Sequence, residues 1–135
     1  MDESRREPAL KLKPQRLADS TDFRRVREQG RCWSDPRLVL CTLPNDLSSL
    51  RVGYSVSKRI GGAVRRNRIK RLMRESIRAY GDLLRPGWDI VIIARQKVSL
   101  ADYWDVQSSV GHLLGLAGVF GSEDTPGAGG SGVIG

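Results

Sequence analysis

The sequence lacks a hydrophobic run long enough to cross a membrane. A spanning helix needs about 20 consecutive apolar residues, and no segment of this 135-residue chain comes near that length. Residues 1–7 are mostly charged and contain no apolar stretch of the kind that a secretory signal requires. We therefore expect a cytoplasmic protein with no membrane partner.

Residues that usually carry metal or catalytic chemistry are also scarce. His112 is the only histidine, and Cys32 and Cys41 are the only cysteines. Two thiols without a second cysteine pair or a histidine cluster do not form a zinc site, so we interpret both as reduced packing residues and assign the histidine no function. Four aspartates lie at ordinary turn, strand-edge and helix positions: Asp82, Asp89, Asp102 and Asp105. The sequence thus predicts no catalytic residue, no metal ligand and no organic cofactor in the protein itself.

Acidic residues are almost absent from one part of the chain. The whole sequence has 23 Lys and Arg against 15 Asp and Glu, a formal net charge of +8. Residues 51–80 contain ten of those cations and a single acid, Glu75. Such a concentrated positive field suits a polyanion, either nucleic acid or an anionic membrane.

Length and composition favour one globular domain with flexible ends. A chain of this size with 39% hydrophobic residues can bury one core without metal or disulfides. Residues 1–15 mix charges with prolines, and residues 121–135 are rich in glycine and serine. We predict a flexible arm over residues 1–15, a domain over 16–119 and a disordered tail over 120–135.

Periodicity predicts three helices and three strands. A first helix begins at an N-cap Ser20, has Phe23 and Val26 on its apolar side, and ends at Gly30 in the left-handed conformation that glycine favours. Strands are predicted over residues 37–43, 51–57 and 88–95. The short loop between the first two favours an antiparallel pair, and the unbroken apolar run of the third favours a central strand covered on both faces. A last helix follows a capping box at Ser99 and Asp102, so the order α–β–β–α–β–α indicates an α+β sandwich with a small mixed sheet.

Residues 62–80 predict an amphipathic helix with a cationic side. At 100° per residue, one sector holds Ile69, Leu72, Met73, Ile77 and Tyr80. The opposite side and its flanks hold Asn67, Arg68, Lys70, Arg71, Arg74 and Arg78. Charged stripes are usually solvated faces that interleave Glu with Lys, whereas arginine predominates here and favours bidentate phosphate contacts. A basic helix lying on a membrane is the competing interpretation, although the apolar sector has no Trp or Phe.

The same segment resembles the signature of the bacterial ribonuclease P protein family. Residues 51–75 read RVGYSVSKRIGGAVRRNRIKRLMRE, and residues 66–68 correspond to that family's RNR motif. The resemblance extends from residue 17 to about residue 116, and it includes the DFxxV pattern of residues 22–26 and the DIVIIAR strand of residues 89–95. It implies a two-layer α/β sandwich with the topology of the second domain of ribosomal protein S5. A mixed sheet of four strands and a left-handed βαβ crossover are implied with it, although general statistics favour the right-handed sense.

The resemblance also implies two RNA-binding sites. The RNR region, which would contact the catalytic RNA, comprises Lys58, Arg59, Arg65, Arg66, Asn67, Arg68, Lys70, Arg71 and Arg74. The cleft that would take the single-stranded 5′ leader of precursor tRNA comprises Phe23, Val26, Arg27, Val39, Cys41, Ser55 and Ser57. Phe23 can stack on a base or simply pack in the core. Arg27 and Cys41 stand where relatives often have aromatic residues, so leader binding is expected to depend less on stacking and more on charge.

The implied activity is removal of the 5′ leader by a ribonucleoprotein. The RNA would cleave the bond with Mg²⁺ ions that it mainly binds itself, while the protein would hold the leader and raise substrate and Mg²⁺ affinity. Three alternatives stay open: a structural RNA-binding protein with no processing role, a DNA-binding regulator, and a nuclease made of protein alone.

Overall fold

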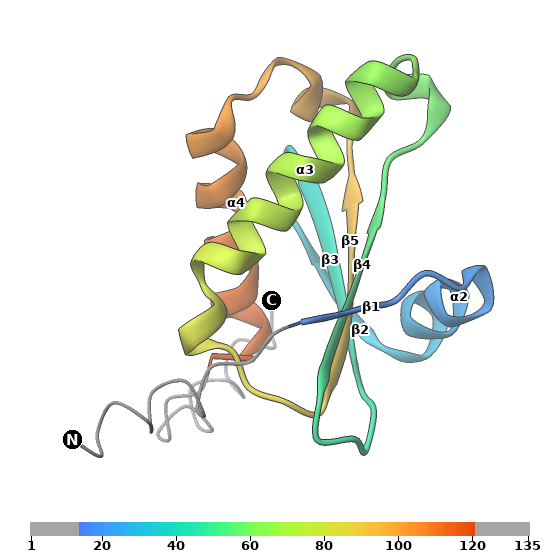
Figure 1. Ribbon diagram of the computed structural model, residues 1–135, viewed down its shortest axis with the longest axis vertical. Helices are drawn as coiled ribbons and strands as arrows, with labels where there is room; N and C mark the ends of the chain where they lie inside the picture. Colours follow the sequence, from blue (N-terminus) through green and yellow to red (C-terminus); the bar gives the residue numbers. More distant parts are fainter. Residues whose placement is uncertain (1–13, 121–135) are drawn as a thin grey trace.

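The computed structural model describes residues 14–120 and contains one five-stranded sheet and three α-helices (Figure 1). In chain order these are β1 (Gln15–Arg16), α2 (Ser20–Gln29), β2 (Arg31–Ser34), β3 (Leu38–Pro44), β4 (Leu50–Ser55), α3 (Ala63–Ala79), β5 (Trp88–Ala94) and α4 (Tyr103–Ala117). Short 3-10 helices occupy Lys58–Ile60, Gly81–Leu83 and Gln96–Leu100. Most of the predicted arm and tail lies outside the described residues.

The sheet is mixed, as predicted, but its pairing differs from the prediction. The strand order is β1-β4-β5-β3-β2, with β1, β4 and β5 parallel to one another and β3 antiparallel to both β5 and β2. The expected antiparallel pairing of the two strands before α3 is therefore wrong, because β5 lies between β3 and β4. The short loop between β3 and β4 does not make them pair, because the more apolar strand β5 pairs with both of them.

The sheet has five strands, not the four that the resemblance implies, and the three strands predicted from periodicity leave out β1 and β2. β1 has only two residues and β2 only four, and both are largely exposed. Strands this short carry too few residues to show an alternating pattern. They pair at the two edges of the sheet, where little of their surface needs to be buried.

Helices cover the two faces of the sheet unequally (Figure 1). α3 and α4 lie on one face over the larger core, which includes Leu40, Ile92 and Met73. α2 lies on the other face, where Val26 packs with Cys41 and Val91. The two-layer prediction is thus incomplete, since α2 adds a partial third layer. The central strand is confirmed: residues 90–92 of β5 are completely buried from both sides.

The helix ends differ in detail from those predicted. Asp19, not Ser20, is the N-cap of α2, and its carboxylate accepts a hydrogen bond from the Thr21 amide at 3.1 Å. Gly30 ends α2 in an extended conformation, with φ of −90°, not in the left-handed one. A Cβ atom there would lie 2.2 Å from the Thr42 carbonyl oxygen, so glycine is required by close approach. The capping box of α4 pairs Asp102 with Asp105 and does not use Ser99.

Candidate RNA-binding surfaces

The helix α3 has the two faces that its periodicity predicts. Ile69, Met73 and Ile77 are almost completely buried against the sheet and α4. Gly62 is the N-cap and offers no side-chain hydrogen bond to the first turn, so the amide groups there are not capped by a side chain. Residues 58–60 form the 3-10 helix just before it, which places two further cations beside this end of α3.

Within residues 14–120, no ion pair compensates the cationic side of α3. We define the α3 surface as Lys58, Arg59, Arg65, Arg66, Asn67, Arg68, Lys70, Arg71, Arg74 and Arg78. Over residues 14–120, none of its cations forms an ion pair with a carboxylate. Arg66 Nε donates a hydrogen bond to the Gly61 carbonyl at 3.2 Å, and Arg68 donates one to the Ala101 carbonyl at 3.5 Å. These contacts orient two guanidinium groups and leave their charge available to an external anion.

A groove of about 680 Å³ runs between α3, β4 and the segment around β1. Its lining includes Asn67, Lys70, Arg74 and Arg78 from α3 and Arg16 from β1, together with Phe23 and Tyr54. Burial raises the pKa of Tyr54 to about 12, although the charges of Arg74 and Arg78 act in the opposite direction. The phenol therefore stays protonated at neutral pH and can donate a hydrogen bond into the groove. Sequence reasoning missed Arg16, which lies in the strand that was too short to recognise.

A second surface lies on the opposite face of the sheet, beside α2. Strand register aligns Val39 of β3, Ile93 of β5 and Ser55 of β4 in one row across three strands. All three are half-buried, unlike Cys41 and Val91 in the next row, which pack beneath α2. We call this row the sheet floor. Ile93 was missed from the sequence because only strand register shows that it lies between two predicted cleft residues.

The remaining predicted cleft residues occupy different positions. Val26 is completely buried between α2 and the sheet, where it packs with Cys41 and Val91. Arg27 is exposed on α2, and Ser57 is exposed beyond the end of β4. Phe23 is half-buried with its ring against Gly53, and it also lines the groove beside α3. The structure therefore places Phe23 between the two surfaces and not over the sheet floor alone.

The two cysteines are joined, contrary to the prediction that both are reduced. Cys32 of β2 and Cys41 of β3 face each other directly in the antiparallel pair and form a disulfide. Local sequence patterns do not indicate this bond, because β2 is too short to be recognised from them and only the β2–β3 register places Cys32 opposite Cys41. The disulfide lies on the α2 side of the sheet and ties the edge strand to its neighbour.

Asp89 is a buried charge on the same face of the sheet. It is completely inaccessible to solvent, and its carboxylate accepts hydrogen bonds from Arg51 at 2.6 and 2.7 Å, from Arg25 at 2.8 Å and from Asn45 at 2.9 Å. Burial alone would raise the pKa of Asp89, but these donors outweigh it and hold the pKa below its usual value. Hydrogen bonds to Asp89 likewise raise the pKa of both Arg25 and Arg51.

Over residues 14–120, no three His, Cys, Asp or Glu side chains are grouped so that they could hold a metal ion. Within the same range, no helix is both long and apolar enough to span a bilayer.

Within residues 14–120, the cations of the α3 surface form no ion pair, and the sheet beside α2 is partly open. These features, on one small α+β domain, define a basic protein suited to binding RNA. The family model for Ribonuclease P matches residues 12–118. The Ribonuclease P protein component of Herpetosiphon aurantiacus is 44% identical over 112 residues, covering 83% of this chain and 91% of the relative. That of Dehalococcoides mccartyi is 43% identical over 109 residues, covering 81% and 89%. The chain belongs to the ribonuclease P protein family.

Solved structures agree with this assignment. The RNase P protein of Staphylococcus aureus superposes with a TM-score of 0.74 at 35% identity, covering 80% of this chain and 99% of that one. The RNase P protein of Thermotoga maritima gives a TM-score of 0.68 at 32% identity, covering 74% and 94%. Membership implies a role in tRNA processing together with an RNA subunit, within an RNA-processing endonuclease complex.

Proposed function

We propose that the α3 surface binds the catalytic RNA of ribonuclease P and that the cleft between α2 and the sheet floor binds the 5′ leader of precursor tRNA. The observation that supports this best is the α3 surface, where nine cations within residues 58–78 form no ion pair with any carboxylate of residues 14–120. Phosphate groups would supply the missing negative charge and release counterions. Arg27, Ser55 and the neighbouring Ser57 would contact the leader.

In this proposal the RNA cleaves the phosphodiester bond and the protein is a non-catalytic subunit. Mg²⁺ would be held mainly by the RNA, because the described protein residues offer no grouped set of ligands for it. By neutralising phosphate repulsion, the protein would strengthen substrate and Mg²⁺ binding together. The family resemblance further leads us to propose a cytoplasmic location, a left-handed crossover from β4 through α3 to β5, and the topology of the second domain of ribosomal protein S5.

The test is cleavage of precursor tRNA by the cognate catalytic RNA at low Mg²⁺, with and without this protein. We expect the protein to increase 5′-leader removal and to lower the Mg²⁺ concentration needed for half-maximal rate. Unchanged cleavage would favour a purely structural RNA-binding protein. Cleavage by the protein without RNA would favour a protein nuclease, and preferential binding of duplex DNA over precursor tRNA would favour a DNA-binding regulator.

A further inference from the structure

The contact between Arg25 and Asp89 connects α2 to the sheet. Arg25 Nη2 donates a hydrogen bond to Asp89 at 2.8 Å and another to Asp22, in its own helix, at 3.1 Å. Within residues 14–120, the bond to Asp89 is the only side-chain hydrogen bond that joins α2 to the sheet. The rest of the contact is apolar packing around Val26, which resists separation but has little directional preference.

Residues other than Arg25 also hold the Asp89 carboxylate in place. Arg51, on the neighbouring strand β4, binds both of its oxygens, and Asn45 binds one of them. The side chains of Arg25 and Arg51 are 31% and 26% exposed, whereas that of Asp89 is 0% exposed. Asp89 is therefore a rigid acceptor in the sheet, and Arg25 is a partly solvated arm that reaches it from the helix.

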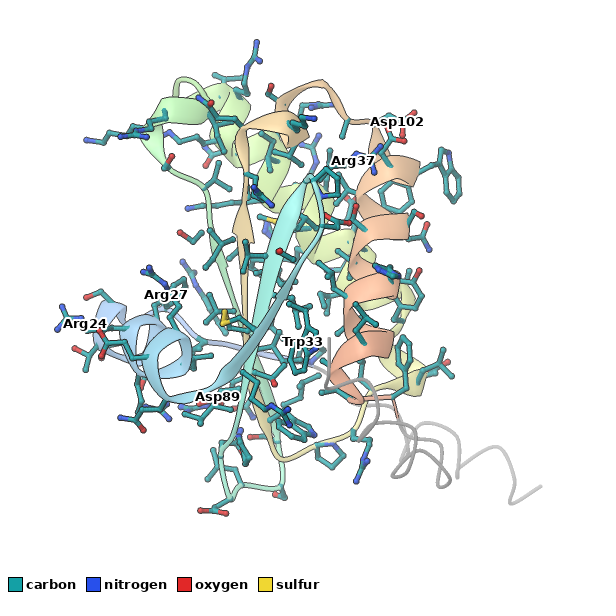
Figure 2. The ribbon with its side chains drawn as sticks, turned by 180° about the vertical axis from the view of Figure 1, so that it is seen from behind. Arg24, Arg27, Trp33, Arg37, Asp89 and Asp102 are labelled. Atoms are coloured by element: carbon teal, nitrogen blue, oxygen red, sulfur yellow. A yellow bond between two sulfur atoms is a disulfide. The ribbon has the colours of Figure 1, made fainter. Side chains whose placement is uncertain are left out.

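The Arg25–Asp89 contact lies away from the sheet floor along β5. Asp89 and Ile93 point to the same face of β5, four residues or about 13 Å apart. Figure 2 shows Asp89 below α2, and Arg27 on the upper side of that helix. The carboxylate that Arg25 binds is therefore four residues along β5 from Ile93 of the sheet floor, so Asp89 does not need to touch a ligand bound there.

We propose that Asp89, acting through Arg25, is a positioning residue for leader recognition, because it fixes the distance between α2 and the sheet floor. This inference rests on the proposed function, in which the leader binds between those two walls. Chain connections and close packing hold the two ends of α2, while over residues 14–120 the Arg25–Asp89 bond is the one side-chain hydrogen bond between the helix and the sheet. Removing this bond should therefore let the helix shift slightly against the sheet floor. Small displacements of binding groups are enough to weaken a ligand held between them.

The experiment compares Arg25→Met with Arg24→Met in the holoenzyme assembled with catalytic RNA. Both variants remove one guanidinium from α2, but Arg24 is exposed and forms no ion pair with any residue of 14–120 (Figure 2). We expect Arg25→Met to raise KM for leader-bearing precursor tRNA by about three- to tenfold, with kcat unchanged. Affinity for mature tRNA and for the catalytic RNA should change by less than about twofold. Arg25→Lys should restore most of the loss, since an ammonium group can still reach Asp89.

A double-variant cycle separates positioning from direct contact with the leader. If Arg25 acts through Asp89, the Arg25→Met effect on KM should disappear in an Asp89→Ala background, where Arg25 has no side-chain acceptor at this position. Persistence of the full effect there would show that Arg25 touches the leader itself, and would overturn the inference. Equal behaviour of Arg25→Met and Arg24→Met would overturn it too, as would equal losses for precursor and mature tRNA. A wild-type holoenzyme that does not discriminate precursor from mature tRNA would instead overturn the proposed function, and the inference with it.

Discussion

The absence of a side chain at Gly53 allows β4, the residues next to β1 and the start of α2 to pack closely together. A Cβ atom at this position would lie 2.5 Å from the Leu17 carbonyl oxygen and 2.5 Å from the Phe23 ring. The first of these groups is backbone beside β1, where the Leu17 amide donates to the Val52 carbonyl at 3.0 Å. Neither neighbour can retreat without disturbing the edge of the sheet or the start of α2.

We therefore expect Gly53→Ala to lower the free energy of unfolding by about 1–3 kcal/mol, through overpacking. Chemical denaturation followed by circular dichroism measures this. Gly115→Ala is the matched control, because the nearest atom to its Cβ is 3.9 Å away, on an exposed part of α4. That variant should be neutral or stabilise the protein by up to about 1 kcal/mol. Equal effects of the two substitutions would contradict the close approach at Gly53.

The role of Asp89 could not have been predicted from the sequence, where it is an ordinary aspartate near the start of a strand. Its partners are 38, 44 and 64 positions away along the chain. Only the strand order, with β5 beside β4, brings Arg51 next to it. Local patterns report which face a residue occupies, but they carry no information on long-range charge partners.

The depressed pKa of Asp89 predicts a specific loss of stability in acid. Because its pKa is lower in the folded protein than in the unfolded chain, its contribution is fully present above the unfolded value and is lost as pH falls through the folded one. Denaturation at a series of pH values should show the free energy of unfolding decreasing below about pH 4. Asp89→Asn should flatten that decrease. An identical dependence on pH in the wild-type protein and the variant would argue against the buried contact.

At the scale of elements, the sequence predicted the helices better than the sheet. The faces of α3 and the burial of β5 follow from periodicities of 3.6 and 2, which need only neighbouring residues. The partners of β3 and β4 depend on which strand best covers the core, and this is a property of the whole chain. The same reason explains the missed disulfide, since it depends on a strand pair that local pattern did not reveal.

The α3 surface predicts a strong dependence of RNA binding on salt. Removing one phosphate contact by Arg71→Ala should weaken binding of the catalytic RNA roughly five- to tenfold at 0.1 M salt and reduce the slope of log K against log salt by about one. Filter binding over a range of KCl concentrations measures both. Arg85→Ala is the control, because it removes another exposed arginine that lies outside the α3 surface. Equal slopes for the two variants would mean that RNA binding depends only on the net charge of the protein and not on the position of Arg71.

The disulfide between β2 and β3 predicts a response to reducing agents. Unfolded protein prepared without reductant should contain no titratable thiol, because the sequence has only the two paired cysteines. Closing a loop of this length stabilises a fold by up to about 2–3 kcal/mol, so reduction should lower the free energy of unfolding by no more than this. The double variant Cys32→Ser, Cys41→Ser should not respond to reductant. Finding two free thiols in the oxidised preparation would contradict the bond.

At the scale of the whole molecule, the sheet separates the two proposed RNA sites. Arg71 lies on α3, which covers one face, and Arg27 lies on α2, which covers the other. Phe23 is the exception, since it contacts Gly53 and also lines the groove with Lys70. Arg71 and Arg27 therefore lie on opposite faces of the sheet, whereas Phe23 and Lys70 line the same groove.

This arrangement predicts how double variants combine. Losses in binding free energy for precursor tRNA should add within about 0.5 kcal/mol for Arg71→Ala with Arg27→Ala, because the two residues are distant and share no partner. Phe23→Ala with Lys70→Ala should deviate from additivity by more than that, because both line one groove. Equilibrium binding to the assembled holoenzyme measures both cycles. Strong coupling in the first pair would show that RNA on one face alters binding on the other, and additivity in the second would place Phe23 in the core alone.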